Sequence, residues 1–180
     1  MRYDFGSDNT AGMAPSAVEG LARANAGYAR SYGSDEITAR AADQIRQRLD
    51  ADAEIRFVFS GTAANAIALS MLAFPFEAVL AHNAAHVCTD ETGAPGFFGQ
   101  GVGLIGLPGF SGRIDPLALK AQLAEPEVGH RQPPAALSLT QATEYGAVYT
   151  EEELRHLIEP VKARGYGVHM DGARLANAVA

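Results

Sequence analysis

Short apolar runs alternate with amphipathic stretches along most of this chain. Runs of strand length that are rich in aliphatic, β-branched or aromatic residues lie at 55–59, 78–81, 135–139 and 166–168. Signals for helix starts separate these runs, near Pro15, Ser34, Ser60, Asp115 and Thr150. Strands that alternate with helices predict an α/β fold, with a mostly parallel sheet and flanking helices.

Three of the predicted helices have recognisable first turns. Proline near the first position marks a helix from Pro15 to about Ala26, and Asp115-Pro116 marks another by the same logic. Thr150 and Glu153 have the spacing of a capping box. These signals predict where the helices begin independently of their hydrophobic pattern.

The helix after Ser34 has a regular apolar stripe. Ser34 is predicted to be its N-cap, with acidic residues in the first turn. Its apolar side chains recur every four residues, at Ile37, Ala41, Ile45 and Leu49. This spacing places them on one face of the helix, and we expect that face to be part of a core.

Polar and small residues gather directly after the predicted strands. The clusters lie at 60–65, 82–91, 140–144 and 171–174. In a parallel sheet with right-handed crossovers, the carboxyl ends of the strands share one edge. Open α/β sheets bind ligands at that edge, so we expect these clusters to form a single site.

The most informative cluster is His169 to Arg174. Asp171 follows a short apolar run that reads as a buried strand, and Arg174 lies three residues later, before the predicted helix 175–178. An acid at this place suits a cofactor ring that needs a counter-ion. The alternative is an aspartate that only caps the next helix. Spacing alone does not separate the two interpretations.

The cluster after the first predicted strand resembles a phosphate site. Ser60-Gly61-Thr62 begins a helix, whose free N–H groups and positive dipole end favour an anion, with the Thr62 hydroxyl as a further donor. The stretch lacks the spacing of a nucleotide P-loop, and a well-capped turn is the alternative. Gly101–Gly106 spells the dinucleotide fingerprint, but its glycines flank a strand-like run, so we discard it.

Histidines follow the second predicted strand. On one helix, His82, His86 and Asp90 would share a face, as a zinc hydrolase requires, but His82 falls where the strand ends. A histidine at this edge is also placed to lie flat on a cofactor ring. The third alternative is a histidine satisfied by neighbouring backbone groups.

Composition narrows the class of protein. The chain has 180 residues, enough for one sizeable core, and its net charge of −7 argues against nucleic acid as a partner. Cys88 is the only cysteine, which favours a reducing compartment and predicts a cytoplasmic protein. No apolar run is long enough to cross a membrane, and residues 1–12 do not read as a signal peptide.

Six motifs, taken together, resemble one family. They are Ser7-Asp8-Asn9, Tyr32-Gly33-Ser34-Asp35, Ser60–Asn65, Ala85-His86-Val87, Thr140–Glu144 and His169–Arg174. Their order is similar to that in low-specificity L-threonine aldolases, and the middle ones resemble the phenylserine aldolase branch. These are β-eliminating lyases that use pyridoxal 5'-phosphate and have the aspartate-aminotransferase-type fold, fold type I.

The resemblance implies roles for the residues at the predicted edge. Gly61 and Thr62 would hold the cofactor phosphate. Asp171 would pair with the pyridine nitrogen and keep it protonated, and Arg174 would contact the phenolic oxygen of the ring. His86 would stack on the ring face. His86 and Asp171 are thus the catalytic candidates, and no metal is implied.

The resemblance also implies how the chain is organised. Ser7 would bind the substrate carboxylate, and the Tyr32 loop would approach the site of a neighbouring subunit in a homodimer or homotetramer. Residues 1–50 would form an N-terminal segment with interface helices. Residues 51–180 would form the large cofactor-binding domain, incomplete and without the C-terminal small domain.

Two departures from the family pattern matter for the chemistry. Many aldolases have a second histidine after the fifth strand, where this chain has Thr143-Glu144-Tyr145. The lysine that binds the cofactor covalently would lie beyond Ala180, since the only lysines are Lys120 and Lys162, on predicted surface helices. We therefore expect this stretch to be inactive alone and to be the N-terminal portion of a longer enzyme.

The resemblance implies retro-aldol cleavage of L-threonine or a related β-hydroxy-α-amino acid, such as phenylserine, to glycine and an aldehyde. His86 is the first candidate for the base that takes the β-hydroxyl proton. The alternatives are another β-eliminating amino-acid lyase, or a fragment that acts only as a binding or scaffold module of the same fold.

Overall fold

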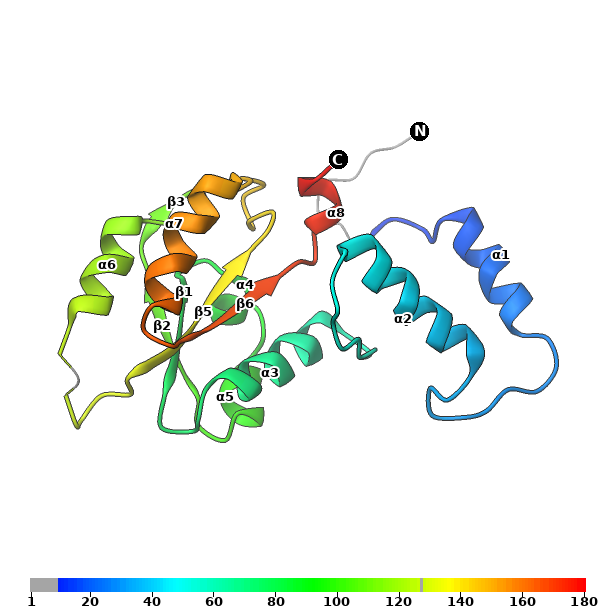
Figure 1. The fold of residues 1–180 in the computed structure, drawn as a ribbon, viewed down its shortest axis with the longest axis horizontal. Coiled ribbons are helices and arrows are strands. Elements are labelled where there is room, and N and C mark those ends of the chain that lie inside the picture. The colour runs from blue at the N-terminus through cyan, green and yellow to red at the C-terminus, as the bar shows by residue number, and fades with distance from the viewer. Residues whose placement is uncertain (1–9, 127) are drawn as a thin grey trace. The chain divides into compact units, whose positions relative to one another are not determined.

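The chain divides into two compact units. A computed structural model describes residues 10–126 and 128–180. One unit ends at Phe57, and the other spans Val58–Ala180 (Figure 1). The first contains helices α1 (Pro15–Ala24) and α2 (Glu36–Leu49), and the second contains the sheet and the other helices.

The second unit is built on a four-stranded parallel sheet. Its order is β2 (Gly103–Leu107), β1 (Ala78–His82), β5 (Pro134–Thr140) and β6 (Gly167–Asp171). The predicted α/β fold with a parallel sheet is therefore confirmed, and the strands predicted at 78–81, 135–139 and 166–168 are present. Because every strand runs the same way, their carboxyl ends lie at one edge, where Thr140 pairs with Asp171.

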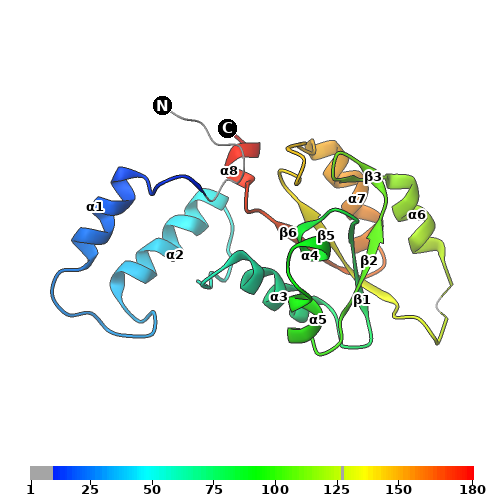
Figure 2. The same ribbon diagram turned by 180° about the vertical axis from the view of Figure 1, so that it is seen from behind.

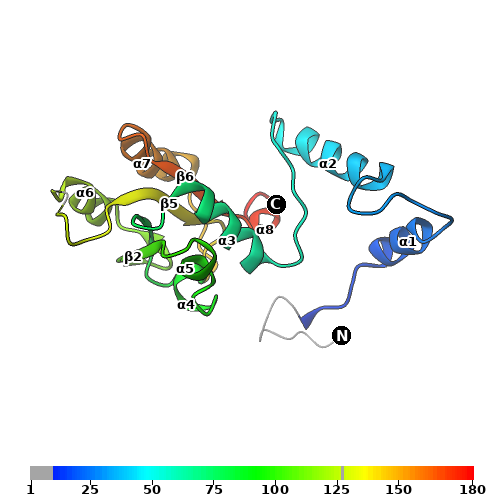
Figure 3. The same ribbon diagram turned by 90° about the horizontal axis from the view of Figure 1, so that it is seen from below.

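Helices cover both faces of this sheet, as Figures 2 and 3 show from two further directions. The layer on one face contains α3 (Gly61–Leu72) and α5 (Ala94–Phe98), and that on the other contains α6 (Pro116–Ala124) and α7 (Glu151–Lys162). The remaining elements are α4 (His86–Thr89), α8 (Leu175–Ala178) and a hairpin of β3 (Gly109–Phe110) and β4 (Arg113–Ile114). In the part of the chain that the structure describes, no helix combines the length and hydrophobicity that a membrane span requires.

The strands are apolar because both faces are buried. Side chains alternate between the faces, so Leu80 packs in one cluster with Leu137, while Val79 and Ala81 pack in the other with Leu69 of α3. The first cluster, on the α6 and α7 side, is built mainly of leucines. The second, on the α3 side, is built mainly of alanine and valine.

Leu137 provides a test of the larger cluster. Its exposed fraction is 0%, so Leu137→Ala is expected to lower the free energy of unfolding of the full-length protein by about 2–5 kcal/mol. Denaturant titration followed by circular dichroism measures this loss. Leu117→Ala is the matched control, because Leu117 is 75% exposed on α6 and should cost less than about 0.5 kcal/mol. Equal losses in the two variants would show that this cluster is not the core.

Most of the predicted helix starts are confirmed. Helix α1 has Pro15 in its first turn, and the Asp115 carboxylate caps α6 by accepting the Leu117 N–H. Thr150 and Glu153 form the complete capping box at α7. The N-cap predicted for the second helix is wrong by one residue.

Asp35, and not Ser34, caps α2. Its carboxylate accepts the backbone N–H groups of Ile37 and Thr38 at 3.0 and 2.8 Å. The hydrogen bonds from the Thr38 N–H and the Thr38 hydroxyl are the main causes that lower the pKa of Asp35. A carboxylate at this place satisfies two free N–H groups and also interacts with the helix dipole, so it is the stronger cap.

The strand predicted at 55–59 is not formed. These residues have no helix or strand assignment, and Phe57 and Phe59 are exposed. High β-propensity expresses a fit to a pleated, partly buried surface, and a strand also needs a neighbour to bond with. No described strand pairs with this segment.

The apolar stripe of α2 is not in a core within this chain. Ile37, Ile45 and Leu49 are exposed, and neither α1 nor α2 has a buried residue. The periodicity correctly predicted an amphipathic helix, but burial of its apolar face requires a surface that covers it. The expectation of a core at this stripe is therefore wrong for the structure described.

Candidate functional site

The polar clusters meet where the strand order reverses. From β1 the chain moves outward to β2 and then returns to β5 on the other side of β1, so the segments that follow β1 and β5 diverge. Open α/β sheets bind ligands at such a switch point. The segments that follow β1 and β5 are joined there by the backbone N–H of His86, which donates to Glu144 Oε1 at 2.9 Å.

Asp171 is the last residue of β6 and lies at this edge. Its Oδ1 accepts the Ala173 N–H at 3.0 Å, and its Oδ2 accepts the Asn65 amide N–H at 2.9 Å. Helix α8 has Arg174 as its N-cap, and no side chain caps it. The alternative in which Asp171 is merely the cap of the next helix is therefore not supported, although its local bond to Ala173 is present.

Helix α3 brings its N-terminus to the same edge. Ser60 caps the helix through its hydroxyl, which accepts the Ala63 N–H at 3.2 Å. The backbone N–H groups of Gly61 and Thr62 lie in the first turn, where the helix itself offers them no carbonyl acceptor. Asn65, about one turn further along, bonds to Asp171. A Cβ placed on Gly61 would meet no atom within 4 Å, so the space beside this helix end is open.

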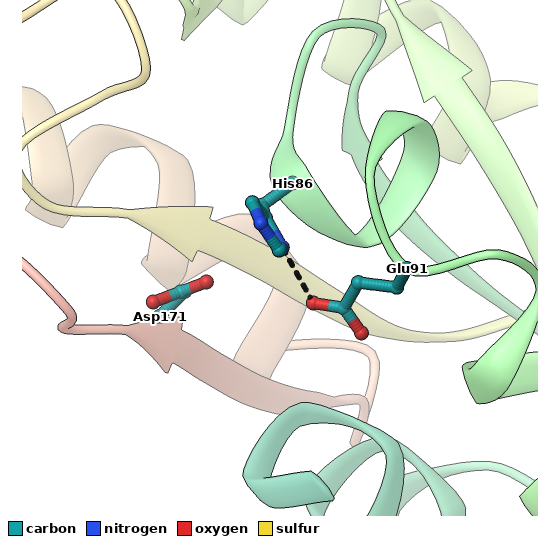
Figure 4. Close-up of side chains that lie close together, drawn as sticks. All are labelled: His86, Glu91 and Asp171. Carbon is teal, nitrogen blue, oxygen red and sulfur yellow. Dashed lines mark hydrogen bonds and ion pairs between the residues drawn. The ribbon is translucent and has the colours of Figure 1, made fainter. Parts of the chain in front are cut away.

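His86 begins α4, directly after the β1 loop, and is paired with Glu91. Its Nδ1 lies 2.9 Å from Glu91 Oε1; the His86 side chain is 40% exposed and that of Glu91 is fully buried. Figure 4 shows the ring and the carboxylate turned toward one another, with Asp171 nearby at the end of β6. The hydrogen bond to Glu91 raises the pKa of His86, burial opposes this effect, and the charges of Glu91 and Asp171 add to it.

Arg174 turns from the end of β6 toward the segment after β5. Its Nε donates to the Ala142 carbonyl at 3.2 Å, and its guanidinium lies 3.8 Å from Glu144 Oε1. Glu144 thus lies between the Arg174 guanidinium and the backbone of His86. This arrangement places the cation at the same edge of the sheet as His86 and Asp171.

The zinc trio considered from the sequence does not assemble. His82 is the buried last residue of β1, where its Nδ1 accepts the Ala84 N–H at 3.0 Å, and α4 begins only at His86. Asp90 bonds instead to the Thr89 hydroxyl. The strand therefore ends too late for His82 to share a helical face with His86.

A different trio brings potential metal ligands together. His86, Glu91 and Asp171 have ligand atoms within 4.8 Å of one another. However, the Asn65 amide nitrogen donates to both carboxylates, at 2.7 Å from Glu91 and 2.9 Å from Asp171. A cation between these oxygens would face N–H donors, so the donor set favours a hydrogen-bonded network.

Sequence reasoning missed the connecting residues of the site. Glu91 and Asn65 stood in the predicted polar clusters, but the bond between them spans 26 residues and the bond from Asn65 to Asp171 spans 106. The compositional signal was a pair of acids, Asp90 and Glu91, at the end of the segment that follows a strand. Ser7 lies outside the described residues, and Tyr32 belongs to the N-terminal unit, where it is fully exposed.

Comparisons with known proteins agree on the kind of protein this chain resembles. The family model described as "Beta-eliminating lyase" matches residues 4–180. A low specificity L-threonine aldolase from Pseudomonas sp. (strain NCIMB 10558) is 42% identical over 176 residues, which are 98% of this chain and 51% of the relative. The protein of the same name from Saccharomyces cerevisiae is 29% identical over 181 residues, covering 100% of this chain and 45% of the relative.

A solved structure shows the same likeness in three dimensions. The threonine aldolase of Leishmania major matches with a TM-score of 0.88 and 33% sequence identity, over 94% of this chain and 49% of that chain. The chain thus spans about half the length of the curated relatives it matches. The fold described above is that of the corresponding half of a fold-type-I protein.

Proposed function

The chain belongs to the beta-eliminating lyase family, and on that premise we propose that the protein containing it cleaves L-threonine or a related β-hydroxy-α-amino acid, such as phenylserine, to glycine and an aldehyde. The family depends on pyridoxal 5'-phosphate. The observation that carries the proposal is the carboxylate of Asp171 at the switch-point edge, beside the N-terminus of α3 and the His86–Glu91 pair.

The residues at this edge fit the cofactor. Gly61 and Thr62 would bind its phosphate, because a helix N-terminus with open space beside it favours an anion. Asp171, already fixed by two N–H donors, would hold a proton on the pyridine nitrogen through its charge. Arg174 would contact the phenolic oxygen, and the partly exposed ring of His86 would lie on the ring face.

When bound, the cofactor supplies an electron sink for the electron pair of the breaking Cα–Cβ bond. The residues of this chain would transfer the proton of the β-hydroxyl group. His86 would accept it from the β-hydroxyl group, directly or through a water molecule, so that the C–O bond becomes the carbonyl of the departing aldehyde. Arg174 and Asp171 would orient the cofactor ring through their contacts with its phenolic oxygen and its pyridine nitrogen.

The test is made with the full-length protein. Addition of pyridoxal 5'-phosphate should give an absorbance band near the visible edge, and L-threonine or phenylserine should then yield equimolar glycine and aldehyde. A cofactor band with cleavage of other amino acids only would favour a different β-eliminating lyase. Absence of both the band and turnover would favour a binding or scaffold module of the same fold.

The two lysines of this chain are not expected to bind the cofactor covalently. Lys120 and Lys162 are exposed on α6 and α7, which cover a face of the sheet rather than its carboxyl edge. Borohydride reduction of the cofactor-loaded full-length protein, followed by peptide mapping, should therefore leave both unmodified. A reduced cofactor adduct on Lys120 or Lys162 would contradict this placement.

We further propose a cytoplasmic homodimer or homotetramer. Cys88 is a free thiol whose pKa is raised by burial, which keeps it protonated and suits a reducing compartment. The exposed stripe of α2 supports a partner subunit as its cover. In this proposal residues 1–50 contribute the interface, with Ser7 and Tyr32 as substrate-binding residues, and residues 51–180 form the large domain.

A further inference from the structure

Glu91 is an acid that neither the predicted motifs nor the proposed chemistry uses. It lies between α4 and α5, and its side chain is fully buried. One of its oxygens, Oε1, is 2.9 Å from His86 Nδ1 and 2.7 Å from the Asn65 amide nitrogen. A buried carboxylate is costly unless it is paired. In the described structure these two groups are the partners of Oε1, whereas Oε2 has no hydrogen-bond partner.

We propose that Glu91 is a positioning residue for His86: it holds the imidazole through Nδ1 and leaves Nε2 as the nitrogen that faces substrate. This inference rests on the proposed function, because it deepens the role of His86 in it.

The tautomer follows from the donors and acceptors. An ionised carboxylate only accepts hydrogen bonds, so the proton shared with Glu91 Oε1 must be on His86 Nδ1. Neutral His86 then has its lone pair on Nε2. Without a partner at Nδ1, the ring would be free to rotate and to exchange tautomers, and a base must present one nitrogen in one place.

Asn65 is a second hydrogen-bond donor to Glu91. Its amide nitrogen donates to Glu91 Oε1 and to Asp171 Oδ2, so one N–H₂ group separates two carboxylates. The opposite orientation of this amide would place its oxygen against both carboxylates. Asn65 therefore links Glu91, which would hold His86 through Nδ1, to Asp171, which would pair with the pyridine nitrogen of the cofactor.

The experiment compares Glu91→Gln, Glu91→Asp and the control Glu152→Gln in the full-length protein. Glu152 is exposed on α7, on the other side of the sheet. The first readout is the titration of the His86 ring by NMR in the cofactor-free protein. We expect a downward shift of its pKa in Glu91→Gln, a smaller one in Glu91→Asp, and none in the control.

The second readout is the pH profile of turnover. Glu91→Gln should lower kcat by about 10- to 100-fold, the scale on which partners that orient an active-site histidine act, with KM changed far less. Its acid limb should move to lower pH, and Glu91→Asp should recover part of both effects. A wild-type titration and wild-type kcat in Glu91→Gln would overturn the proposal.

Other outcomes also decide the matter. If Glu91→Gln does not fold, Glu91→Asp carries the test, and failure of both to fold would show a structural residue and overturn the proposal. A shifted His86 titration in a protein that cleaves no β-hydroxy-α-amino acid would support the positioning and reject the proposed function. Turnover of these substrates without any shift of the His86 titration in Glu91→Gln would support the proposed function and reject the positioning role of Glu91.

Discussion

Asp171→Ala in the full-length protein is expected to lower retro-aldol turnover by about 10²- to 10³-fold or more, which corresponds to several kcal/mol of barrier. In the proposed mechanism this substitution removes the negative charge that would keep the pyridine nitrogen protonated, and a neutral ring is a weaker electron sink. Steady-state turnover of threonine or phenylserine at saturating cofactor measures the effect.

The fold should survive this substitution. Asp171 is only partly buried at a strand end, and its side-chain bonds go to Asn65 and to the adjacent turn. Circular dichroism and thermal unfolding provide the control. Asp171→Asn is the matched variant, because it keeps the shape and removes the charge, and it should lose nearly as much turnover. A folded Asp171→Ala protein with near-normal activity would show that this carboxylate only stabilises its turn.

The second large effect is expected from His86→Phe, which keeps an aromatic ring and removes the proposed base. Turnover should fall by about 10²- to 10⁴-fold, the usual contribution of general base catalysis. The wild-type rate should fall on the acid side as His86 becomes protonated, and because the hydrogen bond to Glu91 raises the pKa of His86, this limb should lie at higher pH than for an unperturbed histidine. The limb should be absent from His86→Phe.

His156→Phe is the control for this substitution, because His156 is exposed on α7. It should retain both the rate and the acid limb. If His86→Phe kept full turnover, the assignment of the base would be wrong even if stacking on the ring survived. Glu144 would then be the next residue to test, because it contacts both the backbone of His86 and the guanidinium of Arg174 at the same edge of the sheet.

The fold was predictable where local and long-range requirements agreed. The runs at 78–81 and 135–139 are apolar throughout because both faces of β1 and β5 are buried, so their pattern already expressed their place in the sheet. Among the described residues, the segment 55–59 has the same local character but pairs with no strand, and the apolar side chains Ile37, Ile45 and Leu49 of α2 are exposed. Propensity and periodicity describe a residue's preference, not whether its partner surface is present.

The site was predictable in outline for a related reason. Parallel strands oblige their carboxyl ends to share an edge, so clusters that follow strands, such as those with His86 and Asp171, must come near one another. The network inside the edge was not predictable, because Asn65 reaches Asp171 from a helix 106 residues away. Which nitrogen meets which oxygen is decided by how closely that helix packs.

That packing distance has its own cause in the unequal faces of the sheet. The face toward α3 is lined by small side chains, among them Ala81 and Ala136, whereas leucines fill the face toward α6 and α7. Small side chains let a helix approach a sheet closely, and the reach of Asn65 is only as long as one short side chain. The two faces should therefore differ in the mutations they tolerate over evolutionary time. Larger side chains on the α3 face would move this helix outward and separate Asn65 from its partners, so that activity is lost while the molecule is still folded. On the leucine face, the same change would mainly lower stability.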